Sequence, residues 1–237
     1  MSLSRGREGM RLYLFKTMAS KITALKQQKR NPSRVNVYLD GEFAFGLAKI
    51  TAAWLNVGQE LSAEEIQELQ AGDEVEKAYQ RALKFISYRP RSTYEVEKNL
   101  LKHEVDEGVI DAVIVRLQDK KWLDDEDFAA AWVENRNTFR PRGRYALQTE
   151  LRQKGLKDAI IERALQGLDE GSLARKASEK KMRSFAALDK RDFKKKLAAY
   201  LARRGFEYGI IKEVCKEAWE TVQSIQSSTH PEKGIRN

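Results

Sequence analysis

Hydrophobic positions from about residue 73 onward repeat three times along the chain. Leu100, Leu151 and Leu201 correspond in the three copies, at separations of 51 and then 50 residues. After each of them comes a set of apolar residues at relative positions 0, 1, 4, 5 and 8, which form one stripe of an α-helix. The three stripes are Val109, Ile110, Val113, Ile114 and Leu117; Ile160, Ile161, Ala164, Leu165 and Leu168; and Ile210, Ile211, Val214, Cys215 and Ala218.

Two further helices are predicted ahead of the stripe in each copy. The second of them ends at a turn where Gly155 and Gly205 stand in the second and third copies, and glycine favours the left-handed conformation of such turns. The first copy has Glu104 there, so the geometry of its turn stays open. Three helices are too few to bury their own apolar faces, and the units are therefore expected to stack on one another.

A β-hairpin is predicted before the repeats. β-branched and aromatic residues alternate on both sides of Asp40-Gly41, a dipeptide typical of a two-residue turn. An isolated hairpin is only marginally stable in water, so its apolar side chains must pack on a helical element, with Trp54 and Leu55 as the expected cover. A short helix is expected to follow, because Ser62 and Glu65 have the spacing of a capping box.

The predicted fold class is all-α, with tandem three-helix repeats in an elongated, curved array behind a small segment of β-hairpin and helix. The first residues are basic and show no sustained apolar period, which favours a disordered arm, and the true translation start within it stays open. The expected divisions are a basic arm at 1–30, the hairpin and short helix at 31–72, repeats at 73–122, 123–171 and 172–222, and a disordered tail at 223–237.

The net charge of +9 is unevenly distributed. Lys and Arg outnumber Asp and Glu by 9 to 1 in residues 1–34 and by 16 to 8 in residues 171–237, whereas residues 35–77 have 2 against 9. Basic regions of this kind favour a polyanionic partner over simple solvation, and nucleic acid is the first candidate.

Several classes of protein are disfavoured by composition. One cysteine and two histidines exclude an internal disulfide and leave little for a metal, so no metal site and no cofactor are expected. No apolar run is long enough for a membrane span or a secretory signal, which predicts a cytoplasmic protein in a reducing compartment. Phosphate-loop, zinc-protease and nucleophile-elbow motifs are missing, so we expect no catalytic residues and no enzyme activity.

The chain resembles the RecX family over about residues 73–220. The resemblance is carried by Arg89-Pro90-Arg91-Ser92, by Leu123-Asp124-Asp125 followed by Phe128-Ala129, and by Leu151-Arg152-Gln153-Lys154-Gly155. It implies a monomeric regulator that binds the RecA nucleoprotein filament and single-stranded or duplex DNA. Inhibition of filament growth, ATP hydrolysis, strand exchange and co-protease activity, and so an effect on the SOS response, are implied with it.

Two basic corners recur 51 residues apart, between the first and second helices of repeats one and two. Their guanidinium groups are candidates for phosphate or carboxylate contacts. The prolines and Ser92 have a structural explanation, because Pro ends a helix and Ser92 with Glu95 forms a capping box. The candidate residues of the corners are Arg89, Arg91, Arg140, Arg142 and Arg144.

Further basic candidates for partner or DNA contact lie in repeats two and three. Arg152 and Lys154 belong to one predicted exposed stripe, although a charge run is most often a solvated face. The third repeat adds Lys194, Lys195, Arg203 and Arg204. Its neighbouring aromatic, Phe206, matches core positions in the other copies and is therefore expected in the core.

Three other features are interpreted as structural. Asp124 and Asp125 stand at the start of an amphipathic helix, where carboxylates cap free amide donors. Cys215 occupies a core position of the third stripe and is not expected to act as a nucleophile.

Two alternatives to a filament regulator stay open. One is a general DNA- or RNA-binding helical-repeat protein, since three-helix units resemble helix-turn-helix modules and the chain is basic. The other is a protein scaffold in which the acidic segment 35–77 covers a basic surface. Strong salt dependence of binding to naked DNA would favour the first alternative.

Overall fold

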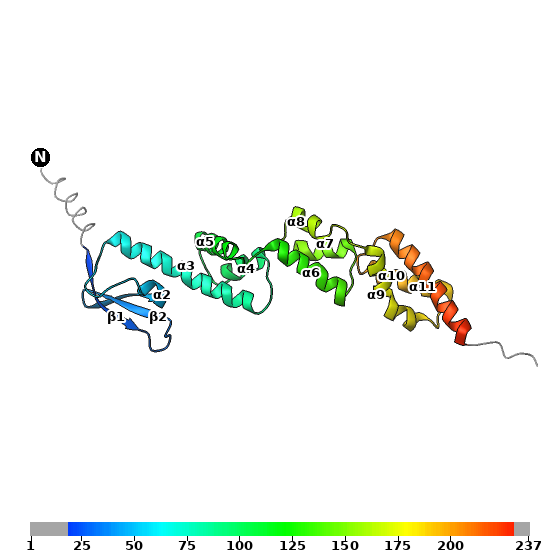
Figure 1. The fold of residues 1–237 in the computed structure, drawn as a ribbon, viewed down its shortest axis with the longest axis horizontal. Coiled ribbons are helices and arrows are strands. Elements are labelled where there is room, and N and C mark those ends of the chain that lie inside the picture. Colours follow the sequence, from blue (N-terminus) through cyan, green and yellow to red (C-terminus); the bar gives the residue numbers. More distant parts are fainter. Residues whose placement is uncertain (1–18, 230–237) are drawn as a thin grey trace, which may run out of the picture. The chain divides into compact units, whose positions relative to one another are not determined.

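The structure, a computed structural model, describes residues 19–229 and divides them into two compact units (Figure 1). The first unit contains residues 19–89 and 96–122, and the second contains residues 90–95 and 123–229. The segment 90–95 therefore belongs with the repeats that follow it, and the first basic corner is divided, with Arg89 in the first unit and Arg91 in the second.

The first unit begins with a four-stranded antiparallel sheet in the order β3-β2-β1-β4. The strands are β1 (Ser20–Gln27), β2 (Arg34–Leu39), β3 (Glu42–Ala48) and β4 (Glu60–Leu61). The predicted hairpin is confirmed as β2 and β3, joined at Asp40 and Gly41, whose φ angles of 51° and 95° are the positive values that the turn requires. Val37 pairs with Phe45, and both side chains are buried.

Strand β1 corrects two predictions. A disordered arm was expected to extend to residue 30, whereas Ser20–Gln27 forms an inner strand between β2 and β4. The fold class is accordingly mixed rather than all-α, although most of the chain is helical. The apolar pattern of this strand is weak, because only Ile22 is fully buried and Leu25 is partly buried against the sheet core, while the backbone pairs with β2 and β4. Residues 1–18 of the predicted arm lie outside the described residues.

The cover of the sheet differs in part from the expectation. Helix α2 (Lys49–Ala52) is followed by Leu55, which packs on the sheet core as predicted. Trp54, expected beside it, is 84% exposed. The main cover is helix α3 (Ala63–Ser87), which begins at the predicted capping box of Ser62 and Glu65.

A buried carboxylate fastens the hairpin to α3. Asp73 of α3 accepts hydrogen bonds from Arg34 of β2, at 2.8 and 3.2 Å, and from the backbone N–H of Ala48, at 2.7 Å. Lys77 lies 2.6 Å from the same carboxylate. Burial raises the pKa of Asp73, but the hydrogen bonds from Arg34, Lys77 and Ala48 outweigh it and leave the pKa below its ordinary value.

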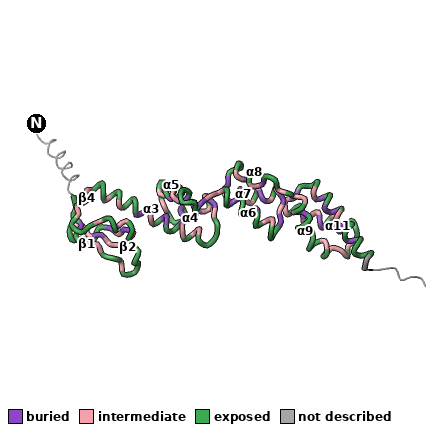
Figure 2. Tube along the Cα trace, in the orientation of Figure 1, coloured by how far each residue is buried: buried purple, intermediate pink, exposed green. Residues whose placement is uncertain are grey.

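The predicted three repeats of three helices are confirmed, and Figure 2 shows the buried positions running through them. Leu100, Leu151 and Leu201 are each fully buried. The helices are α3, α4 (Thr93–Leu101) and α5 (Glu107–Asp119); α6 (Asp125–Phe139), α7 (Arg144–Gln153) and α8 (Asp158–Ala164); and α9 (Glu170–Phe185), α10 (Lys190–Ala202) and α11 (Tyr208–Thr229).

Two boundaries fall elsewhere than predicted. The division at residues 72 and 73 lies inside α3, so one helix serves both the sheet and the first repeat. Residues 223–229 of the predicted disordered tail continue α11, and residues 230–237 lie outside the described residues. The curvature and elongation of the array stay predictions.

The turn after the second helix is the same in all three repeats. Glu104 has a φ of 58°, beside 78° for both Gly155 and Gly205. The next residue donates its N–H to the carbonyl of the matched leucine in each case, from Val105, Leu156 and Phe206, at 3.3, 3.3 and 3.4 Å. A glutamate therefore adopts the left-handed conformation that glycine adopts in the other two copies.

Candidate functional site

The second basic corner, residues 140–143, lies at the joint between the second and third repeats. The N–H of Gly143 donates to the carbonyl of Arg204 at 2.9 Å, and the guanidinium of Arg204 donates to the carbonyl of Pro141 at 3.0 Å. The two backbones approach so closely that a Cβ on Gly143 would lie 2.2 Å from the carbonyl oxygen of Gly205. The start of α7 is thus fixed against the turn that follows α10.

The first basic corner makes the matching tie one repeat earlier, within the second unit. Ser92 accepts from the N–H of Glu95 at 3.3 Å, as expected of a helix cap, and its hydroxyl donates to the carbonyl of Lys154 at 2.6 Å. The ammonium of Lys154 returns to the carboxylate of Glu95 at 2.8 Å. The backbone N–H of Thr93 donates to the carboxylate of Asp125 at 2.8 Å.

The carboxylate of Glu150, on α7, lies among charged and polar groups near the second basic corner. Glu150 accepts from the indole N–H of Trp132 at 2.9 Å and from Arg136 at 2.7 Å, and Arg142 lies 3.5 Å away. The ammonium of Lys154 lies 4.9 Å from the centre of the Trp132 ring. Arg142 and Lys154 are therefore engaged within the fold.

Other candidate cations also bind neighbouring parts of the chain. Arg91 lies 4.0 Å from Glu95, and Arg144 donates to the carbonyl of Leu165 at 2.7 Å. Arg152 pairs with Asp158 at 2.9 Å, but both side chains are more than half exposed, so this pair is weak and solvent-screened.

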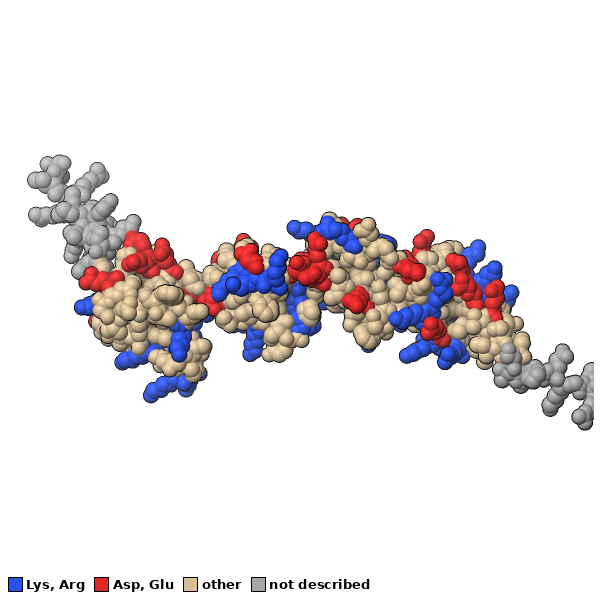
Figure 3. All heavy atoms as spheres, viewed as in Figure 1, with Lys and Arg blue, Asp and Glu red and all other residues tan. Residues whose placement is uncertain are grey.

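Five candidate cations are exposed: Arg89, Arg140, Arg152, Lys195 and Arg203. Lys194 is half-buried. Figure 3 shows Lys and Arg side chains over the third repeat, with Asp and Glu side chains among them. The candidates thus differ in exposure: Arg91, Arg142, Arg144, Lys154 and Arg204 are partly buried and bind other parts of the fold, whereas Arg140, Lys195 and Arg203 are exposed.

The residues interpreted as structural are confirmed in that role. Asp124 caps α6 by accepting from the N–H groups of Glu126 and Asp127, at 2.8 and 3.2 Å. Phe206 and Cys215 are both buried in the core of the third repeat. Burial raises the pKa of the Cys215 thiol, which keeps it protonated and unreactive near neutral pH.

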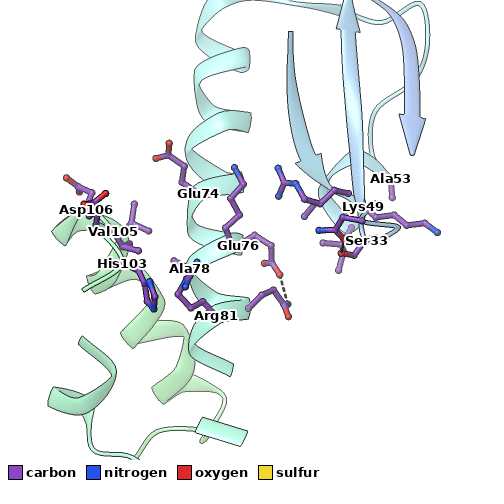
Figure 4. A pocket seen from close by; sticks show the side chains of 18 residues that line it. Ser33, Lys49, Ala53, Glu74, Glu76, Ala78, Arg81, His103, Val105 and Asp106 are labelled. Atoms are coloured by element: carbon purple, nitrogen blue, oxygen red, sulfur yellow. Dashed lines mark hydrogen bonds between the residues drawn. The ribbon is translucent and has the colours of Figure 1, made fainter. Parts of the chain in front are cut away.

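The first unit contains a cleft that the sequence did not predict (Figure 4). It has a volume of about 1310 Å³ and lies along α3, between the sheet side, with Ser33 and Lys49, and the turn between α4 and α5, with His103 and Asp106. Side chains of both charge signs line it. Glu76 is held by Gln80 at 2.8 Å and by Arg116 at 2.6 Å, so part of this lining is already paired within the protein.

No group of three or more His, Cys, Asp or Glu side chains within residues 19–229 is arranged to hold a metal ion. Over the same residues, no helix combines the length and the apolar character needed to cross a membrane.

Comparisons with known proteins match every part of this architecture in order. Family models described as the RecX N-terminal domain and the first, second and third RecX three-helix domains match residues 20–62, 78–117, 124–165 and 169–215. The regulatory protein RecX of Bacillus subtilis is 38% identical over 224 residues, which cover 91% of this chain and 85% of that protein.

The chain belongs to the RecX family. RecX of Bacillus licheniformis is 35% identical over 83% of this chain and 76% of its own length. A crystal structure of regulatory protein RecX superimposes with a TM-score of 0.68 at 28% identity, covering 82% of this chain and 98% of that one. A crystal structure of RecX from Lactobacillus salivarius gives a TM-score of 0.57 at 27% identity and covers 62% and 97% of the two chains.

The family models also include strand β1 in the N-terminal domain. The model of the RecX N-terminal domain begins at residue 20, the first residue of β1, and ends at residue 62, the cap of α3. The sheet is therefore an integral domain of the family and not an appendage to the repeats.

Proposed function

We propose that this protein is a cytoplasmic, monomeric regulator that binds the RecA nucleoprotein filament together with its DNA. By doing so it inhibits the recombinase, ATPase and co-protease activities of RecA, and so modulates DNA repair and the SOS response. It acts by binding and not by catalysis. The observation that carries the proposal is the match to RecX proteins over 91% of the chain, with all four domains in the same order.

The contacts that the candidate residues make within the chain support different roles for them. Arg91, Arg142, Arg144, Lys154 and Arg204 bind carboxylates or carbonyls of their own chain, so their first role is to fix the repeats. Arg89, Arg140, Lys195 and Arg203 are exposed, and exposed arginines and lysines are suited to phosphate or carboxylate on a partner.

A general nucleic-acid binder is the second candidate, favoured by the basic surface of the third repeat. The two functions differ in what they need. A general binder competes for DNA and acts only when the DNA is covered, whereas a filament regulator acts through RecA at low occupancy.

The test is RecA ATP hydrolysis on excess single-stranded DNA, with this protein added well below one molecule per RecA. We expect hydrolysis to fall under these conditions. Inhibition that begins only when the DNA is saturated would contradict the proposal and support the general binder.

Arg140 and Arg142 form a matched pair of variants for the same assay. Arg140→Ala removes an exposed guanidinium, and we expect weaker inhibition with an unchanged melting temperature. Arg142→Ala removes a guanidinium that faces Glu150. We expect the free energy of unfolding to fall by roughly 1 kcal/mol, and the melting temperature to fall with it. Equal inhibition by Arg140→Ala and the unchanged protein would exclude Arg140 from the partner surface.

A further inference from the structure

Each basic corner is flanked by aromatic residues that recur with it. The sequences Tyr88-Arg89-Pro90-Arg91 and Phe139-Arg140-Pro141-Arg142 are 51 residues apart, and each is followed three residues later by a tyrosine, Tyr94 or Tyr145. The repetition thus includes two aromatics and an arginine as well as the proline.

These aromatics are exposed in both copies. Tyr88 and Phe139 are 73% and 74% exposed, and Tyr145 and Tyr94 are 72% and 43% exposed. A single exposed aromatic needs no explanation, but the same exposure at matched positions does, because core packing cannot be its cause. The third repeat lacks the arrangement, since Phe185 at the end of α9 packs on the core and Lys195 replaces the tyrosine.

The backbone that presents the second set is held in place. Phe139 ends α6, Arg140 donates its N–H to the carbonyl of Arg136 at 2.9 Å, and Tyr145 lies in the first turn of α7. Pro141 between them is buried and its carbonyl is bonded to Arg204. Phe139, Arg140 and Tyr145 therefore flank one short, fixed loop, which lowers the entropy lost when a ligand binds.

Aromatic faces beside a guanidinium are suited to unpaired bases. Bases of a single strand stack on aromatic side chains while arginine binds the phosphates, and neither contact requires a particular sequence. In a duplex the base faces are stacked on one another and are not available to such a site. Aromatic side chains beside an arginine should therefore favour single-stranded over duplex nucleic acid, whereas a basic surface alone binds both.

We propose that the second corner is a binding station for single-stranded nucleic acid, with Phe139 stacking on a base and Arg140 on the adjoining phosphate. Tyr145, in the first turn of α7, provides a second aromatic face. This inference deepens the proposed function, on which it rests only for the presence of DNA among the partners.

The test compares a fluorescently labelled single strand with the corresponding duplex, using the full chain. We expect Phe139→Ala to weaken single-strand binding roughly tenfold, the order of magnitude of one lost base stack, and to change duplex binding far less. Phe139→Leu, which keeps apolar bulk without a π face, should behave like Phe139→Ala. Tyr208→Ala is the matched control, because Tyr208 is 79% exposed at the start of α11, outside the corners.

A spectroscopic test reports stacking directly. Phe139→Trp should bind single strands at least as well as the unchanged protein, and the added indole fluorescence should be quenched on titration with single-stranded DNA. Tyr208→Trp should show no such quenching. Unchanged single-strand affinity in Phe139→Ala, or equal loss for single strand and duplex, would overturn the proposal.

The outcomes separate this inference from the proposed function. Loss of RecA inhibition in Phe139→Ala with unchanged binding to naked single strands would place the aromatic on a protein surface of RecA, overturning the station but not the regulator. Loss of single-strand binding in Phe139→Ala, in a protein that does not inhibit RecA at low occupancy, would support the station and overturn the regulator.

Discussion

Gly143 is the residue at which the repeats approach one another most closely. It belongs to the second basic corner, which the sequence analysis singled out for its arginines. The close contact of Gly143 with Arg204 and Gly205 holds the second and third repeats together. The Cβ of any other residue would lie 2.2 Å from the carbonyl oxygen of Gly205. The atoms that it would meet belong to the backbone of Gly205 and Phe206, which cannot rotate aside as a side chain could. The joint between the second and third repeats therefore requires a glycine, which has no Cβ, at position 143.

Gly143→Ala is expected to lower the free energy of unfolding by about 3 kcal/mol or more, because relief of the overlap requires a shift of backbone. Urea unfolding followed by circular dichroism measures the change. Gly72→Ala is the control, since nothing lies within 4 Å of its Cβ position inside α3, and it should instead stabilise by about 1 kcal/mol. Unchanged stability in Gly143→Ala would show that the joint is looser than this geometry.

Glu104 occupies the left-handed position that glycine holds in the other repeats, with φ of 58°. A side chain in this conformation costs about 1 kcal/mol, so Glu104→Gly should raise the melting temperature. Gly155→Ala should lower it, because its Cβ would also meet the ring of Tyr94 at 2.3 Å. A lower melting temperature for Glu104→Gly would mean that the glutamate side chain makes a contact worth more than the strain.

At the scale of elements, the sheet is held to α3 by one buried carboxylate and is otherwise joined by apolar packing. Asp73 satisfies the N–H of Ala48 and the guanidinium of Arg34 simultaneously, so β2, β3 and α3 meet at this side chain. Removal of the carboxylate would leave a partly buried arginine without its partner.

Asp73→Asn is expected to lower the free energy of unfolding at pH 7 by about 3 kcal/mol, as for a broken buried pair. Because the pKa of Asp73 is lowered in the folded chain, its contribution is present above the unfolded pKa of about 3.9 and is lost as the pH falls through the folded pKa. The difference between the two proteins in urea unfolding should therefore shrink between pH 4 and lower pH. A constant difference across this range would contradict the assignment, and Asp119→Asn, an exposed change on α5, is the control.

Elements with their own strong periodicity were predictable, whereas those that depend on distant partners were not. The stripes of the repeats and the Asp40-Gly41 turn appear in the local sequence, and the helices and the hairpin follow from them. Strand β1 has only one fully buried residue and owes its conformation to β2 and β4. Trp54 was misplaced for a related reason, since hydrophobicity does not tell which of two adjacent residues faces the sheet.

The candidate site was predictable to the level of charge and repetition, but not of side-chain role. The sequence indicated two basic corners and a basic third repeat. It could not separate Arg140, which is exposed, from Arg142, which faces Glu150, because the carboxylate comes from the following helix. The aromatics beside the corners recur at the same spacing of 51 residues, so their repetition is visible in the sequence, whereas their exposure is visible only in the structure.

At the scale of the whole molecule, binding to polyanions should be governed by Lys195 and Arg203, the exposed candidate cations of the third repeat. Each phosphate contact releases counterions, so the logarithm of the affinity falls linearly with the logarithm of salt concentration. Lys195→Ala and Arg203→Ala should each reduce the slope by about 1, while Lys212→Ala on α11, outside the candidate set, should leave it unchanged. Equal slopes in all of these proteins would remove the third repeat from the DNA surface.

Both joints between repeats use the same backbone carbonyl of a turn as an acceptor, and this bears on how such a chain can evolve. The N–H of Gly143 and the hydroxyl of Ser92 both bind the carbonyl before a left-handed glycine, at Arg204 in one joint and Lys154 in the other. A duplicated middle repeat would offer the same corner to the same kind of turn. Insertion of one whole repeat would therefore preserve the hydrogen bonds of the joints, so the number of repeats can change by gene duplication without requiring a new interface.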